Sequence, residues 1–514
     1  MQARRSTNGE HTELPVGSTV IARLAQLVEQ QPERNAIIFA PQTGPEQVLS
    51  LRELDRRSNR IARLLAAPGT THESMVVVGV WNCPEHFLVT YAAWKLGALV
   101  LPLRAILPPF ERDQILELAD PAVVFADWED LPYPTLHPSE LHERAAAFSD
   151  EPLPNSHPHP GKAIASGGST GRSKIIVDRT WDPTTAITSR NLGMQQGQTQ
   201  LVAAPLYHNS PMLISHGGLM NEHTLVVMER FNAEQAVDLI ERHRVSYFYF
   251  PPILMRRLAL LPGIDGRDLS SIEAMHSSAA PCPPWLKQRW IELIGAEKVY
   301  EVYGSTEGIG ATTVRGDEWL AHPGTIGRPS NCELKILDEQ GNELPPGGVG
   351  EIFTRTTNPR GRTFEYIGAP PIKTTPDDFA SVGDLGWLDE DGYLYLADRR
   401  VDMIVSGGAN VYPAEIEAAL SDHPGLADVV VIGVPDEEWG RRVHAIVQPA
   451  IPDNPPDARE LDARVRARLA SYKAPKTYEF VTALPRNEAG KIRRSQLVAE
   501  RASGVPTDIA PARD

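Results

Sequence analysis

The stretch Ser166-Gly167-Gly168-Ser169-Thr170-Gly171-Arg172-Ser173-Lys174 decides how the middle of this chain folds. Its three glycines let the backbone turn sharply and point several N–H groups toward one centre. Ser169 and Thr170 add hydroxyl donors, while Arg172 and Lys174 add positive charge. These are the groups that hold a polyphosphate, so the stretch predicts a nucleotide triphosphate as ligand.

The residues around the loop exclude the commonest phosphate loop. A Walker A loop ends in Lys followed by Ser or Thr and opens a helix. Here Lys174 follows Ser173, and residues 175–177 are a β-branched run that favours a strand. Residues 162–165 also have strand character, so we expect strand, loop, strand. An ordinary flexible hairpin loop has a similar composition, and the loop alone does not separate the two interpretations.

Composition limits the class of protein. A chain of 514 residues forms more than one domain, and a net charge of −16 disfavours nucleic-acid and anionic-membrane partners. Residues 1–16 lack the apolar centre of a secretory signal, and no apolar run reaches the length of a membrane span. Cys83, Cys282 and Cys332 lie far apart without metal-ligand spacing. We therefore expect a cytoplasmic protein without a cysteine metal site.

The pattern of apolar segments predicts an α/β fold. Residues 75–80, 84–96 and 98–103 read as strand, helix and strand, a unit that implies a parallel sheet. A second alternating series follows the glycine loop, so we expect two doubly wound sheets in one large unit. Hairpins follow residue 326, and a small α+β region covers about 403–500. We place an N-terminal domain at 1–399 and a small mobile domain at 400–514.

Four further segments combine with the loop. The first is Tyr303-Gly304-Ser305-Thr306-Glu307, with a hydroxyl and a carboxylate after an aromatic ring. Asp384 stands alone in a glycine turn, and Arg399 belongs to a charged junction that leads into a second glycine segment. Lys491 follows Gly490 near the C-terminus. Loop and segments together resemble the adenylate-forming superfamily of acyl- and aryl-CoA synthetases, peptide-synthetase adenylation domains and luciferases.

The resemblance covers almost the whole chain and implies a role for each motif. The loop, with Ser166, Gly167, Gly168, Ser169, Thr170, Gly171 and Lys174, would wrap the β- and γ-phosphates of ATP. Thr306 would touch the α-phosphate and Glu307 would bind Mg²⁺. Ser278, Ala279 and Ala280 would line the adenine, with Tyr303 and Gly304 beside the ring. Asp384 and Arg399 would bind the ribose.

Lys491 would neutralise the α-phosphate and the substrate carboxylate as one anion attacks the other. Taken singly, these residues have ordinary alternatives: a helix-capping charge at Glu307, a turn residue at Asp384, a surface lysine at Lys491 and a salt-bridge partner at Arg399. Their joint order and spacing favour the adenylating interpretation.

Two segments are expected to border the acid. His208, in Pro205-Leu206-Tyr207-His208-Asn209, matches a position beside the acyl site of the family, although a packed core histidine is the alternative. Residues 247–250, Tyr-Phe-Tyr-Phe, either wall the same pocket or form a core strand. A pocket edged by Tyr207, His208, Phe248 and Phe250 would suit a cyclic or aromatic acid.

The family rotates its C-terminal domain between the two half-reactions. Aligned on residues 402–404, the pivot falls on Val401, whereas relatives usually carry Asp or Lys there. A shift of one residue would place Arg400 or Asp402 at the pivot instead.

The loop form and residues 276–281 look most similar to the bile-acid-CoA-ligase-like branch. Coenzyme A is the default acceptor of the acyl group. Direct amide formation with an amine or amino acid, as in relatives similar to coronafacic acid ligase, is the alternative, because the adenylation motifs are shared. We expect a monomer or a homodimer that uses ATP, Mg²⁺ and a small carboxylic acid.

Overall fold

The computed structural model of the chain describes residues 19–72, 74–153, 161–167, 173–182, 192–358, 360–399, 402–406, 409–436, 439–487 and 490–501. Within these residues the predicted α/β fold is confirmed, with several sheets in a large N-terminal domain and a small C-terminal domain.

The first sheet is the predicted parallel unit. It contains β3 (Met75–Gly79), β4 (Leu99–Pro102), β5 (Val123–Ala126) and β6 (Thr135–Leu136), in the order β4-β3-β5-β6 and all parallel. Its associated helices are α2 (Leu51–Ala66), α3 (Pro84–Lys95), α4 (Pro109–Ala119) and α5 (Leu141–Ala146). Helix α3 begins with Pro84 in its first turn and ends before Gly97, whose φ of +73° suits glycine.

A longer sheet, called the central sheet here, forms the middle of the molecule. It contains β1 (Asn35–Ala40), β2 (Gln47–Ser50), β9 (Thr199–Val202), β10 (Thr224–Met228), β11 (Tyr247–Tyr249), β12 (Ala274–Ser277), β13 (Val299–Gly304), β14 (Ala311–Arg315) and β15 (Arg328–Pro329). The order is β15-β14-β13-β12-β11-β9-β10-β1-β2. The run from β13 to β1 is parallel, so the carboxyl ends of β9, β11, β12 and β13 meet at one edge.

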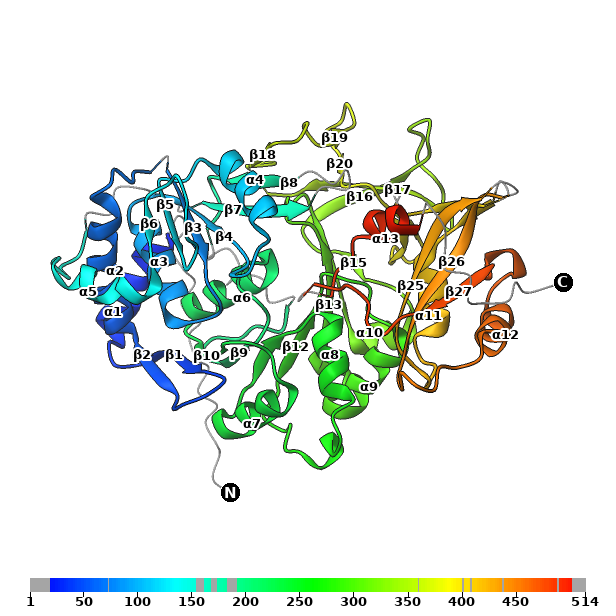
Figure 1. Ribbon diagram of the computed structural model, residues 1–514, viewed down its shortest axis with the longest axis horizontal. Coiled ribbons are helices and arrows are strands. Elements are labelled where there is room, and N and C mark those ends of the chain that lie inside the picture. Colours follow the sequence, from blue (N-terminus) through cyan, green and yellow to red (C-terminus); the bar gives the residue numbers. More distant parts are fainter. Residues whose placement is uncertain are drawn as a thin grey trace, which may run out of the picture.

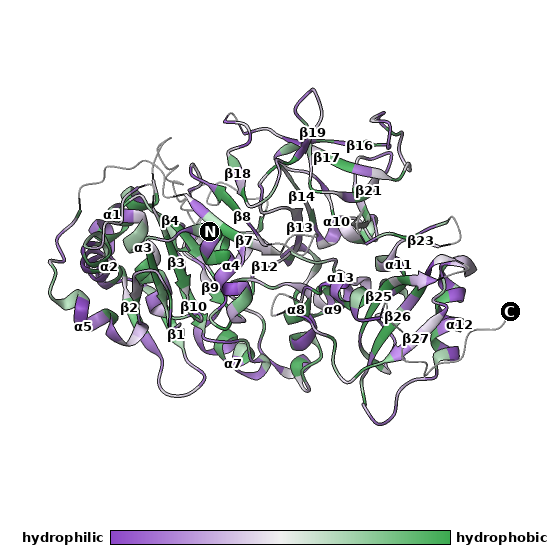
Figure 2. Ribbon diagram, turned by 45° about the horizontal axis from the view of Figure 1, so that its top comes forward, coloured by the Kyte–Doolittle hydropathy of each residue, from purple (hydrophilic) through white to green (hydrophobic). Residues whose placement is uncertain are grey.

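Helices connect these strands. They are α1 (Val20–Gln30), α6 (Asn209–Met220), α7 (Ala233–His243), α8 (Pro252–Ala259), α9 (Pro284–Ile294) and α10 (Gly316–Ala321). The strands carry the buried aliphatic residues of the two main cores, as expected for parallel strands covered on both faces. In Figure 2 the strands are largely green, whereas the outer helices α2 and α5 carry much purple.

The glycine loop joins two antiparallel strands, as predicted. Strands β7 (Lys162–Gly167) and β8 (Ser173–Asp178) pair with each other, and β18 (Phe364–Ile367) pairs with the far side of β8. The last pairing brings a segment from almost 200 positions further along the chain to the glycine loop.

A β-rich subdomain follows the central sheet. It contains β16 (Cys332–Leu337), β17 (Gly350–Thr356), β19 (Lys373–Thr374), β20 (Ala380–Ser381), β21 (Asp384–Leu388) and β22 (Leu394–Arg399). The predicted hairpin is confirmed, because β16 and β17 are antiparallel in register from Cys332 opposite Thr356 to Leu337 opposite Glu351.

The C-terminal domain has hydrophobic clusters of its own, built from residues between 404 and 498. Its elements are β23 (Ile404–Ser406), β24 (Ala409–Val411), α11 (Pro413–Leu420), β25 (Leu426–Asp436), β26 (Gly440–Pro449), α12 (Ala458–Arg468), β27 (Thr477–Phe480) and α13 (Arg494–Arg501). Figure 1 shows this domain, orange to red, at the opposite end of the molecule from α1 and α2. None of the helices in the described part of the chain is long and apolar enough to cross a membrane.

Candidate active site

The two described ends of the glycine loop lie on β7 and β8, and Lys174 contacts Glu307 in the turn that follows β13. Ser166 and Lys174 face each other across the β7–β8 pair, and Gly167 is opposite Ser173. The predicted phosphate ligands Gly168, Ser169, Thr170 and Gly171, together with Arg172, lie outside the described residues. The structure therefore shows the two ends of the loop, and its inner ligands stay predictions.

Lys174 and Glu307 form an ion pair at the end of this loop. Lys174 Nζ lies 3.2 Å from Glu307 Oε1 and 3.8 Å from the centre of the Tyr366 ring. Tyr366 Oη donates to the same Glu307 oxygen at 2.6 Å. Burial alone would favour the neutral acid, but the Tyr366 hydrogen bond and the Lys174 charge outweigh it and lower the pKa of Glu307. The site therefore holds a fixed carboxylate that is 8% exposed.

Tyr303 and Asp384 meet at the next position along the same edge. Tyr303 precedes Gly304, the last residue of β13, and its Oη donates to Asp384 Oδ2 at 2.8 Å. Asp384 opens β21 directly after Gly383, whose φ is +87°. Arg399 is opposite Asp384 in the β21–β22 register, and its side chain lies outside the described residues. Two residues predicted to hold the nucleoside are thus in direct contact.

The predicted adenine-lining segment leaves the carboxyl end of β12. Ser278 follows this strand directly, and Ala279 has a φ of +79°, in the left-handed region that disfavours alanine. Such strained residues cluster at ligand sites, because the surrounding structure must hold them in place. Ala280 continues the same turn.

His208 lies at the N-terminal end of α6, with its ring 4.3 Å from that of Tyr207. Burial, followed by the charges of Lys491 and Arg104, lowers the pKa of His208 to about 3, so the ring is neutral at pH 7. Its buried Nε2 has no hydrogen-bond partner among the described residues. An unpaired buried nitrogen beside two cations is a place where a ligand group could bind.

Lys491 reaches this place from the C-terminal domain. Its backbone N–H donates to Asn487 Oδ1 at 2.9 Å, and the Asn487 N–H donates back to the Lys491 carbonyl at 2.9 Å. The preceding Gly490, with φ +74°, lies against Ile253 of α8; a Cβ at this glycine would be 3.0 Å from that side chain. The turn therefore holds Lys491 against the N-terminal domain.

The alternative core interpretation is confirmed for Phe248 and Phe250. Both are fully buried, their rings are 4.6 Å apart, and Phe248 packs against Trp290. Because side chains alternate along a strand, these two point into the core, away from Tyr249. Tyr249 interacts instead with the hydroxyls of Ser210 and Ser278. The expectation that Phe248 and Phe250 edge the pocket is therefore wrong.

The structure adds three residues that sequence reasoning missed. Tyr366 binds Glu307 through the β18–β8 pairing, Arg104 lies near His208, and the Lys162 ammonium donates to the Thr306 carbonyl oxygen at 3.3 Å. Of these three residues, only Lys162 could have been noticed in the sequence, because a lysine is unusual at the start of an apolar strand. At the hinge, Arg400 and Val401 lie outside the described residues, while Asp402 pairs with Arg494 at 3.1 Å.

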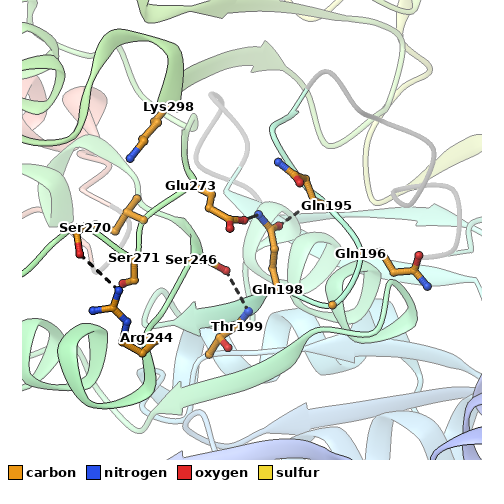
Figure 3. A pocket seen from close by; sticks show the side chains of 12 residues that line it. Gln195, Gln196, Gln198, Thr199, Arg244, Ser246, Ser270, Ser271, Glu273 and Lys298 are labelled. Atoms are coloured by element: carbon orange, nitrogen blue, oxygen red, sulfur yellow. Dashed lines mark hydrogen bonds between the residues drawn. The ribbon is translucent and has the colours of Figure 1, made fainter. Parts of the chain in front are cut away.

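A polar hollow of about 530 Å³ lies at the other end of the central strands (Figure 3). Thr199 is the first residue of β9, and Ser246, Glu273 and Lys298 directly precede β11, β12 and β13. Gln198 Nε2 donates to Glu273 across it at 2.8 Å. Ligands of parallel sheets bind at the carboxyl ends of strands, so this hollow is separate from the candidate site.

The fixed carboxylate of Glu307 fits Mg²⁺. This ion is usually bound by one or two carboxylates with waters and substrate phosphates completing its shell. Among the described residues no cluster of three or more His, Cys, Asp and Glu side chains could hold a metal by itself. Glu307 could therefore supply one carboxylate to Mg²⁺, with the substrate phosphates and waters as its other ligands.

Comparisons with known proteins agree with this geometry. The AMP-binding enzyme family matches residues 24–359, and the AMP-binding enzyme C-terminal domain matches residues 415–491. A fatty acid–[acyl-carrier-protein] ligase of Streptomyces coeruleorubidus is 30% identical, over 94% of this chain and 96% of that protein. An indoleacetate–CoA ligase of Aromatoleum aromaticum is 29% identical, over 92% and 96%.

A solved structure of a related enzyme is also similar over almost the whole chain. The o-succinylbenzoate coenzyme A synthetase of Bacillus subtilis, in complex with ATP and magnesium, is 26% identical, with a TM-score of 0.78 over 92% of this chain and 98% of that one. The protein therefore belongs to the AMP-binding enzyme family and is an ATP-dependent, adenylate-forming ligase.

Proposed function

We propose that the protein activates a ring-bearing carboxylic acid with ATP and transfers the acyl group to coenzyme A. The observation that carries the proposal is a convergence at one sheet edge. Lys174, Glu307, Tyr303 and Asp384 line up there, and Lys491 approaches from the other domain beside His208. A polyphosphate end, a nucleoside end and a cation between them are the parts that adenylate formation needs.

On the polyphosphate side, residues 166–174 hold the β- and γ-phosphates, which leave as pyrophosphate. Lys174 supplies charge there, and the Thr306 hydroxyl binds the α-phosphate. Glu307 holds Mg²⁺, which when bound neutralises phosphate charge. Tyr366 supports this role because its hydrogen bond keeps Glu307 ionised.

On the nucleoside side, residues 278–280 line the adenine and Tyr303 covers the ring. Asp384 accepts from the ribose hydroxyls, and Arg399 lies opposite it in the strand register. The Tyr303–Asp384 hydrogen bond supports this assignment, because it fixes the ring relative to the ribose ligand.

Lys491 acts between the two reactants. A carboxylate oxygen attacks the α-phosphorus, a P–O bond forms, and the bond to pyrophosphate breaks. The ammonium of Lys491 lowers the repulsion between the two anions. His208 stays neutral at this position and borders the acid without adding a third charge. The mobile unit that carries Lys491 is proposed to span 400–514, with 1–399 as its partner.

Several observations bear on the acid and the acceptor. Indoleacetate and o-succinylbenzoate, which stand in the names of two relatives, both contain a ring. Tyr207, His208 and Tyr249 supply aromatic surface beside the site, with the Ser210 and Ser278 hydroxyls at its polar end. The loop form looks most similar to the bile-acid-CoA-ligase-like branch, but coronafacic-acid-ligase-like relatives share the adenylation motifs, so amide formation is the alternative.

One experiment tests both halves of the proposal. The protein is incubated with ATP, Mg²⁺ and a panel of acids that runs from acetate to two-ring acids, and pyrophosphate release is measured. Coenzyme A, an amino acid or a phosphopantetheinylated carrier protein is then added, and products are identified by mass. Thioester to coenzyme A from a ring-bearing acid is the expected result. Equal turnover of acetate, or amide without thioester, contradicts the proposal.

A further inference from the structure

Lys162 is a buried cation at the first position of β7. The residue is only 5% exposed. Burying an unpaired ammonium costs several kcal/mol, so a lysine in such a place needs compensating partners. Burial lowers the pKa of Lys162 to about 8, against the opposing charges of Asp178 and Glu307.

The hydrogen bonds of this ammonium leave its own strand. Lys162 Nζ donates to Asn209 Oδ1 at 2.6 Å and to the Thr306 carbonyl oxygen at 3.3 Å. It also lies 5.6 Å from the centre of the Trp181 ring. Asn209 is the first residue of α6 and directly follows His208.

These contacts join three segments that are far apart in the sequence. Strand β7 leads into the glycine loop, α6 begins at His208, and the turn after β13 carries Thr306 and Glu307. Because the Thr306 carbonyl belongs to the peptide that precedes Glu307, a bond to that oxygen fixes the orientation of the turn. It also leaves the Thr306 hydroxyl available for a ligand.

We propose that Lys162 is a positioning residue for adenylate formation, and that its ammonium holds the Thr306–Glu307 turn and the His208 end of α6 in one arrangement. The inference rests on the proposed roles of Thr306 and Glu307. Lys162 acts through these residues and through Asn209, and it forms no part of the reaction itself.

A second buried lysine provides a matched control. Lys95 is 6% exposed, and its ammonium donates to Asp55, Ser58 and Asn59 of α2. Burial lowers its pKa to about 8, as for Lys162. Lys95 lies on α3 and its partners lie on α2, both beside the first sheet. Replacing Lys95 therefore removes a comparable buried cation without touching the candidate site.

The test compares K162M, K162R and K95M in the full chain. Pyrophosphate release is measured with a fixed acid, and thermal unfolding gives the stability of each variant. We expect K162M to lower kcat about 100-fold, because small displacements of positioned groups have effects of this size. The KM for the acid should change by less than about threefold, which separates positioning from lost substrate binding.

K162R should recover to within about tenfold of the original kcat, because a guanidinium still donates to two acceptors. K95M should keep its kcat and lose only stability. The inference is overturned if K162M keeps its kcat, or if K95M loses as much as K162M.

A smaller change covers the case in which K162M does not fold. N209A removes one acceptor and leaves the Thr306 contact, so we expect kcat to fall about tenfold without loss of the fold. Unchanged kcat in N209A overturns the inference. If no acid supports pyrophosphate release by the original protein, the proposed function is contradicted and the inference falls with it; activity in K162M equal to the original contradicts the inference alone.

Discussion

The two sides of the candidate site are held in different ways. On the N-terminal side, Glu307 is bound by Lys174 and Tyr366, and Tyr303 is bound by Asp384, all through part-buried side chains. On the C-terminal side, Lys491 arrives on a domain with its own core. Arg493 pairs with Glu111 at 2.6 Å while 61% exposed, and Arg256 donates to the Leu426 carbonyl at 3.0 Å.

The residues predicted to bind the nucleotide and the predicted catalytic lysine thus belong to different domains. On the N-terminal side, side-chain bonds join three sheets: Glu307 and Tyr303 lie at the end of the central sheet, Lys174 and Tyr366 on β8 and β18, and Asp384 on β21. The exposed Arg493–Glu111 pair contributes little, about 0–1 kcal/mol, so the Arg256 hydrogen bond and the packing of Gly490 on Ile253 matter more for holding Lys491. Lys491 therefore belongs to a separately folded domain, whereas Glu307 and Tyr303 are held within the N-terminal domain.

The strongest test of this comparison removes the lysine. We expect K491A to lower adenylate formation about 100- to 1,000-fold, because the charge between the two anions is lost. Transfer from a supplied acyl adenylate should stay within about threefold, since the N-terminal side is intact. Pyrophosphate release and thioester formation measure the two steps. K476A, in the same domain beside Trp439, is the control; equal losses in both half-reactions contradict the division.

The next test removes the negative charge of Glu307 on the N-terminal side of the site. E307Q keeps the shape of the side chain and an oxygen for Tyr366, but removes the charge. We expect pyrophosphate release to fall about 100-fold and the Mg²⁺ concentration for half-maximal rate to rise, because a neutral amide binds this cation poorly. E365Q on the neighbouring position of β18, 60% exposed, should change neither. An unchanged Mg²⁺ dependence in E307Q contradicts the metal role.

A glycine tests how Lys491 is presented. G490A forces a Cβ to 3.0 Å from Ile253 at a φ of +74°, so the turn must shift. We expect adenylate formation to fall about tenfold, with transfer unchanged, since displaced groups lose rate steeply. Gly440 has φ +68°, and none of the described residues comes within 4 Å of the place its Cβ would take, so G440A adds strain without displacement. Similar losses in both variants would show that strain alone is responsible.

The smallest expected effect is on the stability of the protein at low pH. Burial lowers the pKa of His86 from 6.5 to about 4, so the unfolded chain takes up a proton in this window while the folded chain does not. The free energy of unfolding therefore falls as the pH drops from about 6.5 toward 4, by up to about 3 kcal/mol for this residue. His208, His216, His223 and His276 of the N-terminal domain add to the trend.

We expect H86F to make the loss of stability with falling pH shallower, as measured by denaturant unfolding at several pH values. Tyr91 is joined to His86 through the rings of Phe87 and His216. Y91F changes this aromatic cluster without removing a histidine, so it should keep the slope of the original protein. Equal slopes in H86F and the original protein contradict the assignment.

The sequence predicted the elements whose signals are local. The β-branched run after Lys174 gave β8, Pro84 and Gly97 bounded α3, and turn residues marked the β16–β17 hairpin. Residues 247–250 show the limit of such local signals. An apolar strand has the same sequence pattern whether it lines a pocket or fills a core. Phe248 of β11 and Phe250 just after it turned out to be core, because β11 lies in the middle of the central sheet and both side chains pack into one buried cluster.

By itself, the sequence determined the family, because each motif is a short run of residues and the motifs follow one another in the family's order along the chain. Only the tertiary structure decided which of them touch: Tyr366 reaches Glu307 through a strand pairing, and Lys162 joins β7 to α6 and to the turn after β13. Pairing and burial depend on contacts between distant segments, and the spacing of residues in the sequence carries no record of them.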